Sequence, residues 1–223
     1  MFLQKWVVIT LVVCLFTFTS VAGAETVLFF EDFSSDAIGD FPSSFGREGF
    51  LWGDVSPVFQ VLDGLEGNDG KALVVLGQEL GSQGYLTSPT MNLAKSDFVI
   101  EFDIFVPGES ENKYDAGFYV FANDPFVWPP FINIYVGNGR LTVVEGSKET
   151  TAGDVTMGQW NHITLRSNLA DSTTIVSIND QALERPYAFR TVIDANTPKI
   201  YLAIFWRRDN RPDTYWDNFK VWQ

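Results

Sequence analysis

The sequence predicts an all-β domain built as a sandwich or a barrel. Short runs of β-branched and aromatic residues alternate with turn residues at intervals of about 8–15 residues, which is typical of these architectures. No long helical period, internal repeat or linker rich in proline, glycine or serine interrupts this pattern. Because about 200 residues is enough chain for one substantial core, a single domain is expected.

The start of the chain has the three parts of a secretory signal peptide. Lys5 is the only charge before Glu25, an almost wholly apolar run extends from Trp6 to Phe16, and Ala22-Gly23-Ala24 forms an A-x-A cleavage site. The run of about 11 apolar residues is shorter than the roughly 20 that span a bilayer. An uncleaved membrane anchor is the alternative.

We therefore expect residues 1–24 to be removed, and residues 25–223 to form one secreted domain, extracellular or periplasmic. The only cysteine, Cys14, lies in the leader and follows Val13 rather than the small residue that a lipoprotein site needs. The mature part, 223 minus 24 or 199 residues, then has no cysteine. Without disulfides it depends on its hydrophobic core or on a bound metal.

The net charge disfavours some classes of binding partner for this protein. The chain has a formal charge of −13, and loss of Lys5 with the leader makes it −14. Such a surface repels phosphate backbones and anionic lipid, so nucleic acid is not expected as a partner, and neither is membrane insertion after cleavage. The same acidity suits divalent cations, although scattered solvated carboxylates give the same total.

The expected strands follow directly from the apolar runs. Hairpin turns are expected at Gly137-Asn138-Gly139 and at Asn179-Asp180, since these residues tolerate left-handed backbone angles. The stretches Glu31–Pro57 and Asn123–Pro130 are expected to be loops over the sheet edges. The strands are Thr26–Phe30, Val58–Leu62, Ala72–Leu76, Gly84–Thr87, Phe98–Val106, Ala116–Ala122, Phe131–Val136, Arg140–Val144, Trp160–Arg166, Thr173–Ile178, Tyr187–Phe189, Lys199–Trp206 and Tyr215–Trp222.

Alternation along the strands separates an apolar face from a mixed aromatic and polar face. The mixed face includes Glu101 and Asp103 on one strand and Asn133 and Tyr135 on another. Such a face suits a sugar, whose C–H groups stack on rings while its hydroxyls bond to polar side chains. The alternative is that aromatic residues are simply good strand formers in a protein that is 15% aromatic.

Short motifs stand at both ends and in the middle of the mature chain. They are Glu31-Asp32-Phe33, Gly39-Asp40-Phe41-Pro42, Val99–Val106, Gly158–Leu165, Val176–Asp180 and Asp217–Val221. These motifs are similar to those of bacterial concanavalin A-like, laminin G-like jelly rolls, and they extend over essentially the whole mature chain. The resemblance implies a two-sheet antiparallel jelly-roll sandwich, a fold that carries many functions.

The same resemblance implies a structural calcium ion. In many sandwich domains of this kind that handle carbohydrate, the first and last strands are neighbours and a calcium ion bridges them through carboxylates and carbonyls. Glu31, Asp32 and Asp217 are the matching acids here. The alternative is that Asp32 and Asp217 cap turns or edge strands.

An enzyme of the same fold is the second interpretation. The laminarinase-like glycosidases carry E-x-D-x-x-E on one strand, and a retaining mechanism needs two carboxyl groups about 5–5.5 Å apart. This chain has Glu101 and Asp103, but Val106 stands where the third acid belongs. Alginate lyases of the fold use Gln-x-His, whereas Trp160 precedes the lone His162 at that spacing. No catalytic residue is therefore assigned.

Two further segments are candidates for recognition. The proline-rich loop Asn123–Phe131 carries Phe126 and Trp128, which act either as a rigid sugar platform or as a lid on the core. Trp206–Arg211 is the only basic cluster, and it either receives an anionic group or balances neighbouring aspartates.

The leading functional prediction is a secreted, lectin-like module that binds a glycan through one sheet and its loops. A polysaccharide-degrading hydrolase or lyase, and a structural or adhesive domain with a protein partner, stay open as alternatives. The candidate ligand-binding residues are Glu101, Asp103, Tyr119, Trp128, Asn133, Tyr135 and Arg207, and the candidate metal ligands are Glu31, Asp32 and Asp217.

Overall fold

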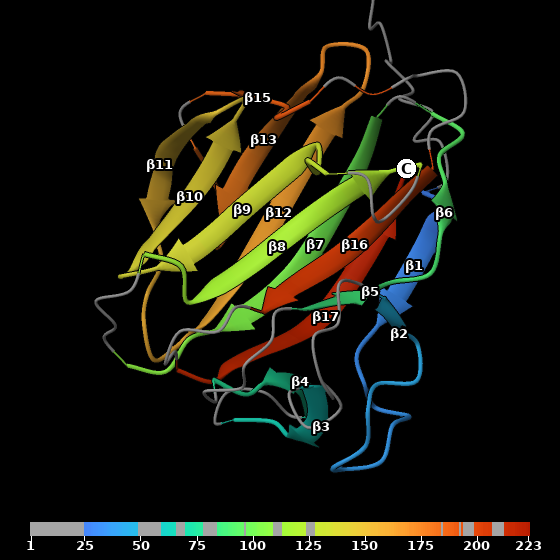
Figure 1. Cartoon of the computed structure of the whole chain (residues 1–223), viewed down its shortest axis with the longest axis vertical. Coiled ribbons are helices and arrows are strands. Elements are labelled where there is room, and N and C mark those ends of the chain that lie inside the picture. The colour runs from blue at the N-terminus through green and yellow to red at the C-terminus, as the bar shows by residue number, and fades with distance from the viewer. Residues whose placement is uncertain are drawn as a thin grey trace, which may run out of the picture.

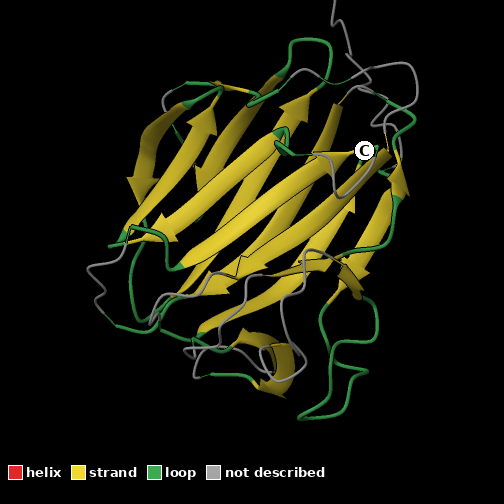
Figure 2. Cartoon of the chain, in the orientation of Figure 1, coloured by secondary structure: helices red, strands yellow, loops and turns green. Residues whose placement is uncertain are grey.

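The protein is a sandwich of two antiparallel β-sheets, as the sequence predicts. In Figure 1, strands β8, β9 and β16 of one sheet lie in front of β7, β12 and β17 of the other. The computed structural model describes residues 25–48, 59–65, 70–77, 84–95, 97–108, 113–123, 128–183, 185–191, 193, 199–206 and 212–223. Within these ranges the chain consists of strands and loops (Figure 2), and none of them forms a helix that would cross a membrane.

Sheet A has nine strands and contains both ends of the described chain. Its main path runs β14-β13-β12-β7-β17-β4-β3, while β1 pairs with β17 and β15 pairs with β13. The bounds are β1 Val27–Glu31, β3 Phe59–Asp63, β4 Lys71–Val75, β7 Asp97–Phe105, β12 Trp160–Asn168, β13 Thr173–Ile178, β14 Gln181–Ala182, β15 Tyr187–Ala188 and β17 Thr214–Trp222.

Sheet B has eight strands in the order β11-β10-β9-β8-β16-β5-β2, with β6 paired to β16. The bounds are β2 Gly46–Glu48, β5 Gly84–Thr87, β6 Met91–Asn92, β8 Ala116–Ala122, β9 Ile132–Gly137, β10 Arg140–Glu145, β11 Lys148–Asp154 and β16 Lys199–Trp206.

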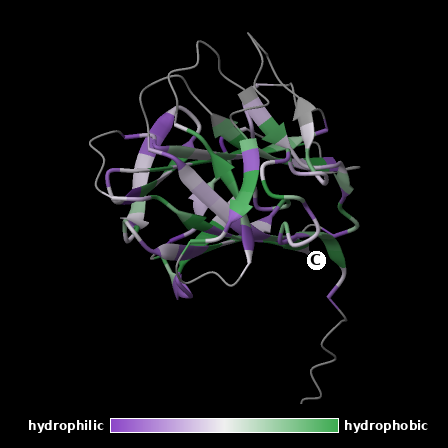
Figure 3. Ribbon diagram, turned by 90° about the horizontal axis from the view of Figure 1, so that it is seen from below, coloured by the Kyte–Doolittle hydropathy of each residue, from purple (hydrophilic) through white to green (hydrophobic). Residues whose placement is uncertain are grey.

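Strand alternation places one hydrophobic core between the two sheets. Phe102 of β7 and Phe118 of β8 meet across the sandwich with ring centroids 4.4 Å apart, and Trp216 and Phe219 of β17 pack beside them. Figure 3 shows the hydrophobic colour along the strands and hydrophilic colour at many turns. Burial of these rings supplies the main stabilising free energy, since no disulfide is available.

The predicted hairpins form where asparagine and glycine adopt left-handed backbone angles. Asn138 and Gly139 have φ of 51° and 66° between β9 and β10, and Asn179 and Asp180 have φ of 50° and 64° between β13 and β14. Two successive positive φ values match the right-handed twist of the flanking strands. Both predicted turns are therefore confirmed.

The predicted first and last strands are neighbours. β1 pairs with the second half of β17, with Glu31 opposite Phe219. Asn218 has a φ of 53° at the point where the register between β17 and β7 shifts. This bulge turns the side chain of Asn218 toward β7, where it reaches Asp103.

Candidate functional site

The side of sheet B that faces away from the core carries a cluster of aromatic side chains, of which Tyr119 and Phe121 are buried, and we call this side the aromatic face. Tyr119 packs against Phe205 with stacked rings 5.3 Å apart, and Tyr85 lies 5.2 Å from Phe205. Alternation along β5, β8, β9 and β16 puts these rings on one side. The members on the strands are Tyr85, Tyr119, Phe121, Tyr135, Tyr201 and Phe205.

A glycine near the start of β8 lets the rings close over the strand. Gly117 is paired with Phe205 on one side and with Tyr135 on the other. A Cβ atom at Gly117 would lie 3.1 Å from the Cβ of Phe205 and 3.5 Å from the Cδ1 of Tyr135. The absence of a side chain at this position thus allows both neighbours to lean across the backbone.

The polar centre of the aromatic face is a pair of tyrosine hydroxyls beside a buried amide. The hydroxyls of Tyr119 and Tyr135 are 2.8 Å apart, and Nδ2 of Asn133 lies 3.5 Å from the Tyr135 hydroxyl. Asn133 is fully buried, and its Oδ1 has no hydrogen-bond partner among the described residues. Exchanging the amide O and N would leave the other atom in the same position, so one polar atom lacks a protein partner either way.

Burial keeps two tyrosines of the aromatic face, Tyr85 and Tyr119, protonated. Desolvation raises the pKa of Tyr85 to about 12, with a smaller contribution from Tyr135. Desolvation also raises the pKa of Tyr119, and the neighbouring Tyr135 adds to it. These hydroxyls therefore act as neutral hydrogen-bonding groups across the physiological pH range.

An exposed tryptophan borders the polar centre. The side chain of Trp128 is 53% exposed, and its ring meets Tyr119 edge to face at 5.9 Å. The guanidinium of Arg190 lies 4.7 Å from the centroid of the Trp128 ring, and the amide N–H of Arg190 donates to the carbonyl of Phe131 at 2.8 Å. Trp128 is therefore held in place while part of its ring faces solvent.

A second group of side chains fixes the other border. Tyr114 packs on Tyr135 at 4.6 Å and donates its hydroxyl proton to Oε1 of Glu149 at 2.7 Å. Lys113 forms an ion pair with the same carboxylate. Hydrogen bonds from Lys113 and then Tyr114 lower the pKa of Glu149, so the carboxylate stays charged. The aromatic face thus combines rings with neutral and charged hydrogen-bonding groups, as a polyhydroxylated ligand requires.

The other predicted ligand-binding residues on strands lie on the opposite side of the sandwich. Glu101 and Asp103 point outward from β7 of sheet A, whereas Tyr119, Trp128, Asn133 and Tyr135 gather at sheet B. The prediction from strand alternation, that all of them belong to one face, is therefore wrong. Alternation along a strand distinguishes side chains that face the core from side chains that face outward. It does not show which of the two sheets an outward side chain belongs to, because both sheets of a sandwich have an outward surface.

Asp103 is the centre of a hydrogen-bond network on sheet A. Its Oδ1 lies 2.7 Å from Nδ1 of His162, and its Oδ2 accepts from Nδ2 of Asn218 at 2.8 Å. The backbone N–H of His162 donates to Oδ1 of Asn179 at 2.8 Å. Val106, at the position of the missing third acid, is buried in the core. The sheet A carboxylates are thus arranged as a structural network around one histidine.

The pKa of His162 is expected to lie above about 6.5, its ordinary value. The hydrogen bond to Asp103 raises it, and partial burial opposes the rise. The hydrogen bond between protonated His162 and Asp103 stabilises the folded state. This contribution is complete below the unfolded-state pKa of His162, and it is lost as the pH rises through the folded-state pKa of His162. Because the chain has one histidine, the titration of its Hε1 resonance by proton NMR is unambiguous. Asp103→Asn should move the midpoint back toward 6.5, and a wild-type midpoint at or below 6.5 would contradict this interpretation.

The three predicted calcium ligands are engaged with nearby backbone groups. Oε1 of Glu31 accepts from the N–H of Phe33 at 2.6 Å, and Oδ1 of Asp32 accepts from the N–H of Ser34 at 3.0 Å. Oδ1 of Asp217 likewise accepts from the next N–H along the chain, at 2.7 Å. Among the described residues, no three acidic, histidine or cysteine side chains come together as a metal site. One oxygen of each carboxylate is thus engaged by the backbone, and calcium binding stays a prediction.

A lysine ammonium interacts with the loop that follows β1. Nζ of Lys71, on β4, donates to the backbone carbonyl of Ser34 at 3.0 Å and to that of Asp36. Oδ1 of Asp36 accepts from the N–H of Ser43 at 3.1 Å. A side chain of the protein thus places a positive charge on carbonyl oxygens of this loop and ties it to β4.

Some residues at the aromatic face were not among the predicted site residues, and some predicted residues lie outside the described ranges. Arg190 follows the short strand β15 and has no motif around it, whereas Tyr85 and Phe205 could have been found from alternation in their predicted strands. The predicted ligand residue Arg207 and the predicted platform residue Phe126 lie outside the described residues. Residues 1–24, the predicted leader, do so as well.

Comparison with solved structures finds the same fold at low sequence identity. No protein-family model matches the chain, and no curated protein sequence matches it. Among solved structures, it is similar to a conserved carbohydrate esterase of Shiga toxin-encoding bacteriophage phi24B, with a TM-score of 0.62, 15% identity and coverage of 89% of this chain and 98% of that one.

Two further solved structures have the same architecture. Domain 4 of AbnA, a GH43 extracellular arabinanase from Geobacillus stearothermophilus in complex with arabinotriose, gives a TM-score of 0.54, 17% identity and coverage of 89% and 93%. The binding domain of Paraclostridial Mosquitocidal Protein 1 gives a TM-score of 0.54, 19% identity and coverage of 88% of this chain and 48% of that one. At these identities the likeness establishes the β-sandwich fold alone.

Proposed function

We propose that this chain is a secreted carbohydrate-binding module that holds a glycan against the aromatic face of sheet B. Trp128 provides the stacking surface for the C–H face of a sugar ring, and the hydroxyls of Tyr119 and Tyr135 bond to its hydroxyl groups. The amide of Asn133 completes the polar centre. Flat rings next to neutral donors and acceptors are what sugar recognition requires.

The observation that carries this proposal is the polar centre beside an exposed ring. A buried amide atom without a partner costs about 1–3 kcal/mol, and Oδ1 of Asn133 has none among the described residues, directly beside the Tyr119–Tyr135 hydroxyl pair. Trp128 is more than half exposed although it has Tyr119 to pack against. A ligand hydroxyl at this point would satisfy the amide while its ring covers the tryptophan.

The similar structures support the same class of ligand. Domain 4 of the arabinanase was solved with arabinotriose, and this chain spans nearly all of that domain. A phage carbohydrate esterase has the same fold over nearly its whole chain, and a sialidase has it over 18% of its chain. Catalysis receives no comparable support, because both oxygens of Asp103 are engaged and the position of the third acid is Val106 in the core.

The test is a glycan and polysaccharide array with protein expressed from the full chain, in calcium and in chelator. We expect binding to a defined glycan class, and Trp128→Ala to weaken it by roughly 10- to 100-fold, since truncating an aromatic anchor costs about 2 kcal/mol or more. Tyr135→Phe should cost less, because it removes one hydroxyl and retains the ring.

Phe30→Ala is the matched control. Phe30 is a similarly exposed aromatic residue, at 56%, but it lies on β1 of sheet A. Its loss should leave glycan binding unchanged. Equal weakening by both variants, or no glycan binding by a protein shown to be folded, would refute the proposal and favour a protein partner. Release of a product sugar would favour the enzyme.

A further inference from the structure

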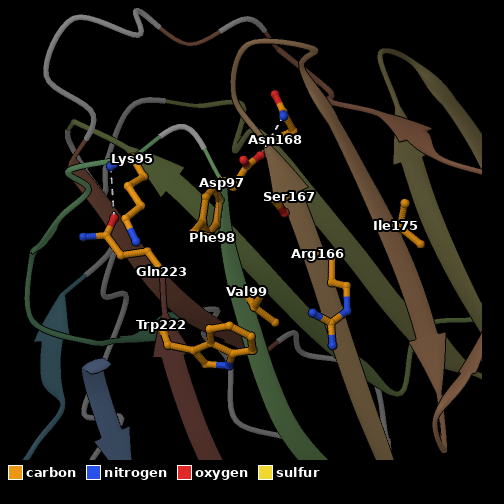
Figure 4. A pocket seen from close by; sticks show the side chains of 10 residues that line it. All are labelled: Lys95, Asp97, Phe98, Val99, Arg166, Ser167, Asn168, Ile175, Trp222 and Gln223. Carbon is orange, nitrogen blue, oxygen red and sulfur yellow. Dashed lines mark hydrogen bonds between the residues drawn. The ribbon is translucent and has the colours of Figure 1, made fainter. Parts of the chain in front are cut away.

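A hollow of about 450 Å³ lies on sheet A, away from the aromatic face. Figure 4 shows side chains from β7, β12, β13 and β17 around it, together with the segment before β7. It is separate from the Asp103 network, since neither Asp103 nor His162 contributes to it. The lining residues are Lys95, Asp97, Phe98, Val99, Arg166, Ser167, Asn168, Ile175, Trp222 and Gln223.

The hollow exists because a small side chain lies between large ones in one row across the sheet. The strand register places Trp222 of β17 opposite Val99 of β7, and Val99 opposite Arg166 of β12. Arg166 is in turn opposite Ile175 of β13. Neighbouring side chains in such a row are about 4.5–5.5 Å apart at Cβ, so the short Val99 leaves a depression between Trp222 and Arg166.

In the next row of paired residues along the strands, polar side chains close one end of the hollow. Asp97 of β7 is opposite Asn168 of β12, and Nδ2 of Asn168 donates to Oδ1 of Asp97 at 2.6 Å. Oε1 of Gln223 accepts from the N–H of Lys95 at 3.2 Å, and holds this segment beside the hollow. One end of the depression is therefore a fixed carboxylate and amide, both able to bond to hydroxyl groups.

The other end of the hollow carries the cationic side chain of Arg166, which has no ion-pair partner among the described residues. The guanidinium of Arg166 lies 5.8 Å from the ring centroid of Trp222, and its side chain is exposed. Within the described residues it forms no ion pair or side-chain hydrogen bond. Lys220 also lies over the Trp222 ring, at 5.4 Å, but it faces Glu25 at 4.0 Å. Lys95 and Arg166 outnumber Asp97 in the lining, so the hollow is locally positive on a chain whose formal charge is −13.

We propose that this hollow is a second ligand site, which takes a carboxylated sugar residue of the uronic acid class. The C–H face of the sugar packs on Trp222 and Val99, its hydroxyls bond to Asp97 and Asn168, and its carboxylate pairs with Arg166. The hollow is within the roughly 300–1,000 Å³ of small-molecule sites. A planar guanidinium matches a carboxylate with two parallel hydrogen bonds. This site does not depend on the aromatic face.

The experiment is an NMR titration of protein expressed from the full chain with methyl glucuronide and, as the matched ligand, methyl glucoside. We expect the glucuronide to shift the indole N–H signal of Trp222, assigned with Trp222→Phe, and to bind at least tenfold more tightly than the glucoside. Arg166→Gln should weaken glucuronide binding at least tenfold and remove its preference. Arg140→Gln, an exposed arginine on β10 of the other sheet, should change nothing.

The variant Trp128→Ala distinguishes binding at the hollow of sheet A from binding at the aromatic face of sheet B. It should leave the glucuronide titration unchanged, even if it abolishes glycan binding at the aromatic face. Three results would overturn the second site: no glucuronide binding, equal binding of the two glycosides, or glucuronide binding that survives Arg166→Gln. Loss of the Trp222 shift in Trp128→Ala would also overturn it, because the sugar would then be bound at sheet B.

Discussion

Trp216→Ala should lower the free energy of unfolding by about 3–5 kcal/mol, the usual cost of truncating a large buried aromatic side chain. Trp216 is 1% exposed and contacts Phe102 at 5.6 Å, Phe219 at 6.2 Å and Phe118 at 6.4 Å between ring centroids. Phe118 belongs to sheet B and the other rings to sheet A, so the indole joins the two layers. Nε1 of Trp216 also donates to Oγ1 of Thr214 at 3.0 Å.

The measurement is a urea unfolding curve followed by far-ultraviolet circular dichroism. Because domains are commonly stable by only about 5–15 kcal/mol, the variant should lose a large fraction of its stability. Trp216→Phe is the graded control, since it retains a ring and loses only the hydrogen bond and part of the volume. A loss below about 1 kcal/mol in Trp216→Ala would mean that this ring does not join the sheets.

The hydrophobic pattern was sufficient to predict nearly all of the long strands. The runs Gly84–Thr87, Ala116–Ala122, Thr173–Ile178 and Lys199–Trp206 have the same bounds in the structure. Each combines β-branched or aromatic residues with a period of two, which helices do not share. Bounds elsewhere differ by one or two residues, because pairing with a neighbour, rather than composition, decides where a strand ends.

The strands that the sequence did not indicate are short or polar. β11, Lys148–Asp154, has mostly exposed or half-buried residues and lies at the edge of sheet B, where charged side chains prevent pairing with another chain. β2, β6 and β14 have only two or three residues. β2 and β6 form by long-range pairing with β5 and β16, which no local pattern indicates. β11 and β14 pair with the preceding strands across hairpins, but their residues lack the apolar runs that predict strands.

The candidate sites could likewise be predicted only in part from the sequence. Alternation identified Asn133 and Tyr135 as outward, and β9 does place them beside Tyr119. It could not assign Glu101 and Asp103 to the other sheet, because strand order depends on pairing between distant segments. The hollow on sheet A had no sequence signal for the same reason: Trp222, Val99 and Arg166 form a row only once the register is known.

Asn161→Leu should lower the free energy of unfolding by about 2–4 kcal/mol, even though leucine has the same number of heavy atoms and the same branching at Cγ. Asn161 is fully buried at the start of β12. Its Oδ1 accepts from the N–H of Thr156 at 3.0 Å, and its Nδ2 donates to the carbonyls of Thr156 at 2.8 Å and Gln159 at 2.9 Å. A typical intramolecular hydrogen bond contributes about 0.5–1.5 kcal/mol, and leucine removes all three.

The effect should extend beyond this turn. Nδ2 of Asn179, at the tip of the β13–β14 hairpin, lies 3.4 Å from Oδ1 of Asn161, and Oδ1 of Asn179 accepts from the N–H of His162. Hydrogen exchange should therefore accelerate in the turn at 155–159 and in the hairpin tip, while the core strands stay protected. Asn92→Leu, which changes an exposed amide on β6, should alter stability by no more than about 0.5 kcal/mol. If both variants unfold at the same urea concentration as the wild type, the buried amide is not what holds β12 to the turn before it.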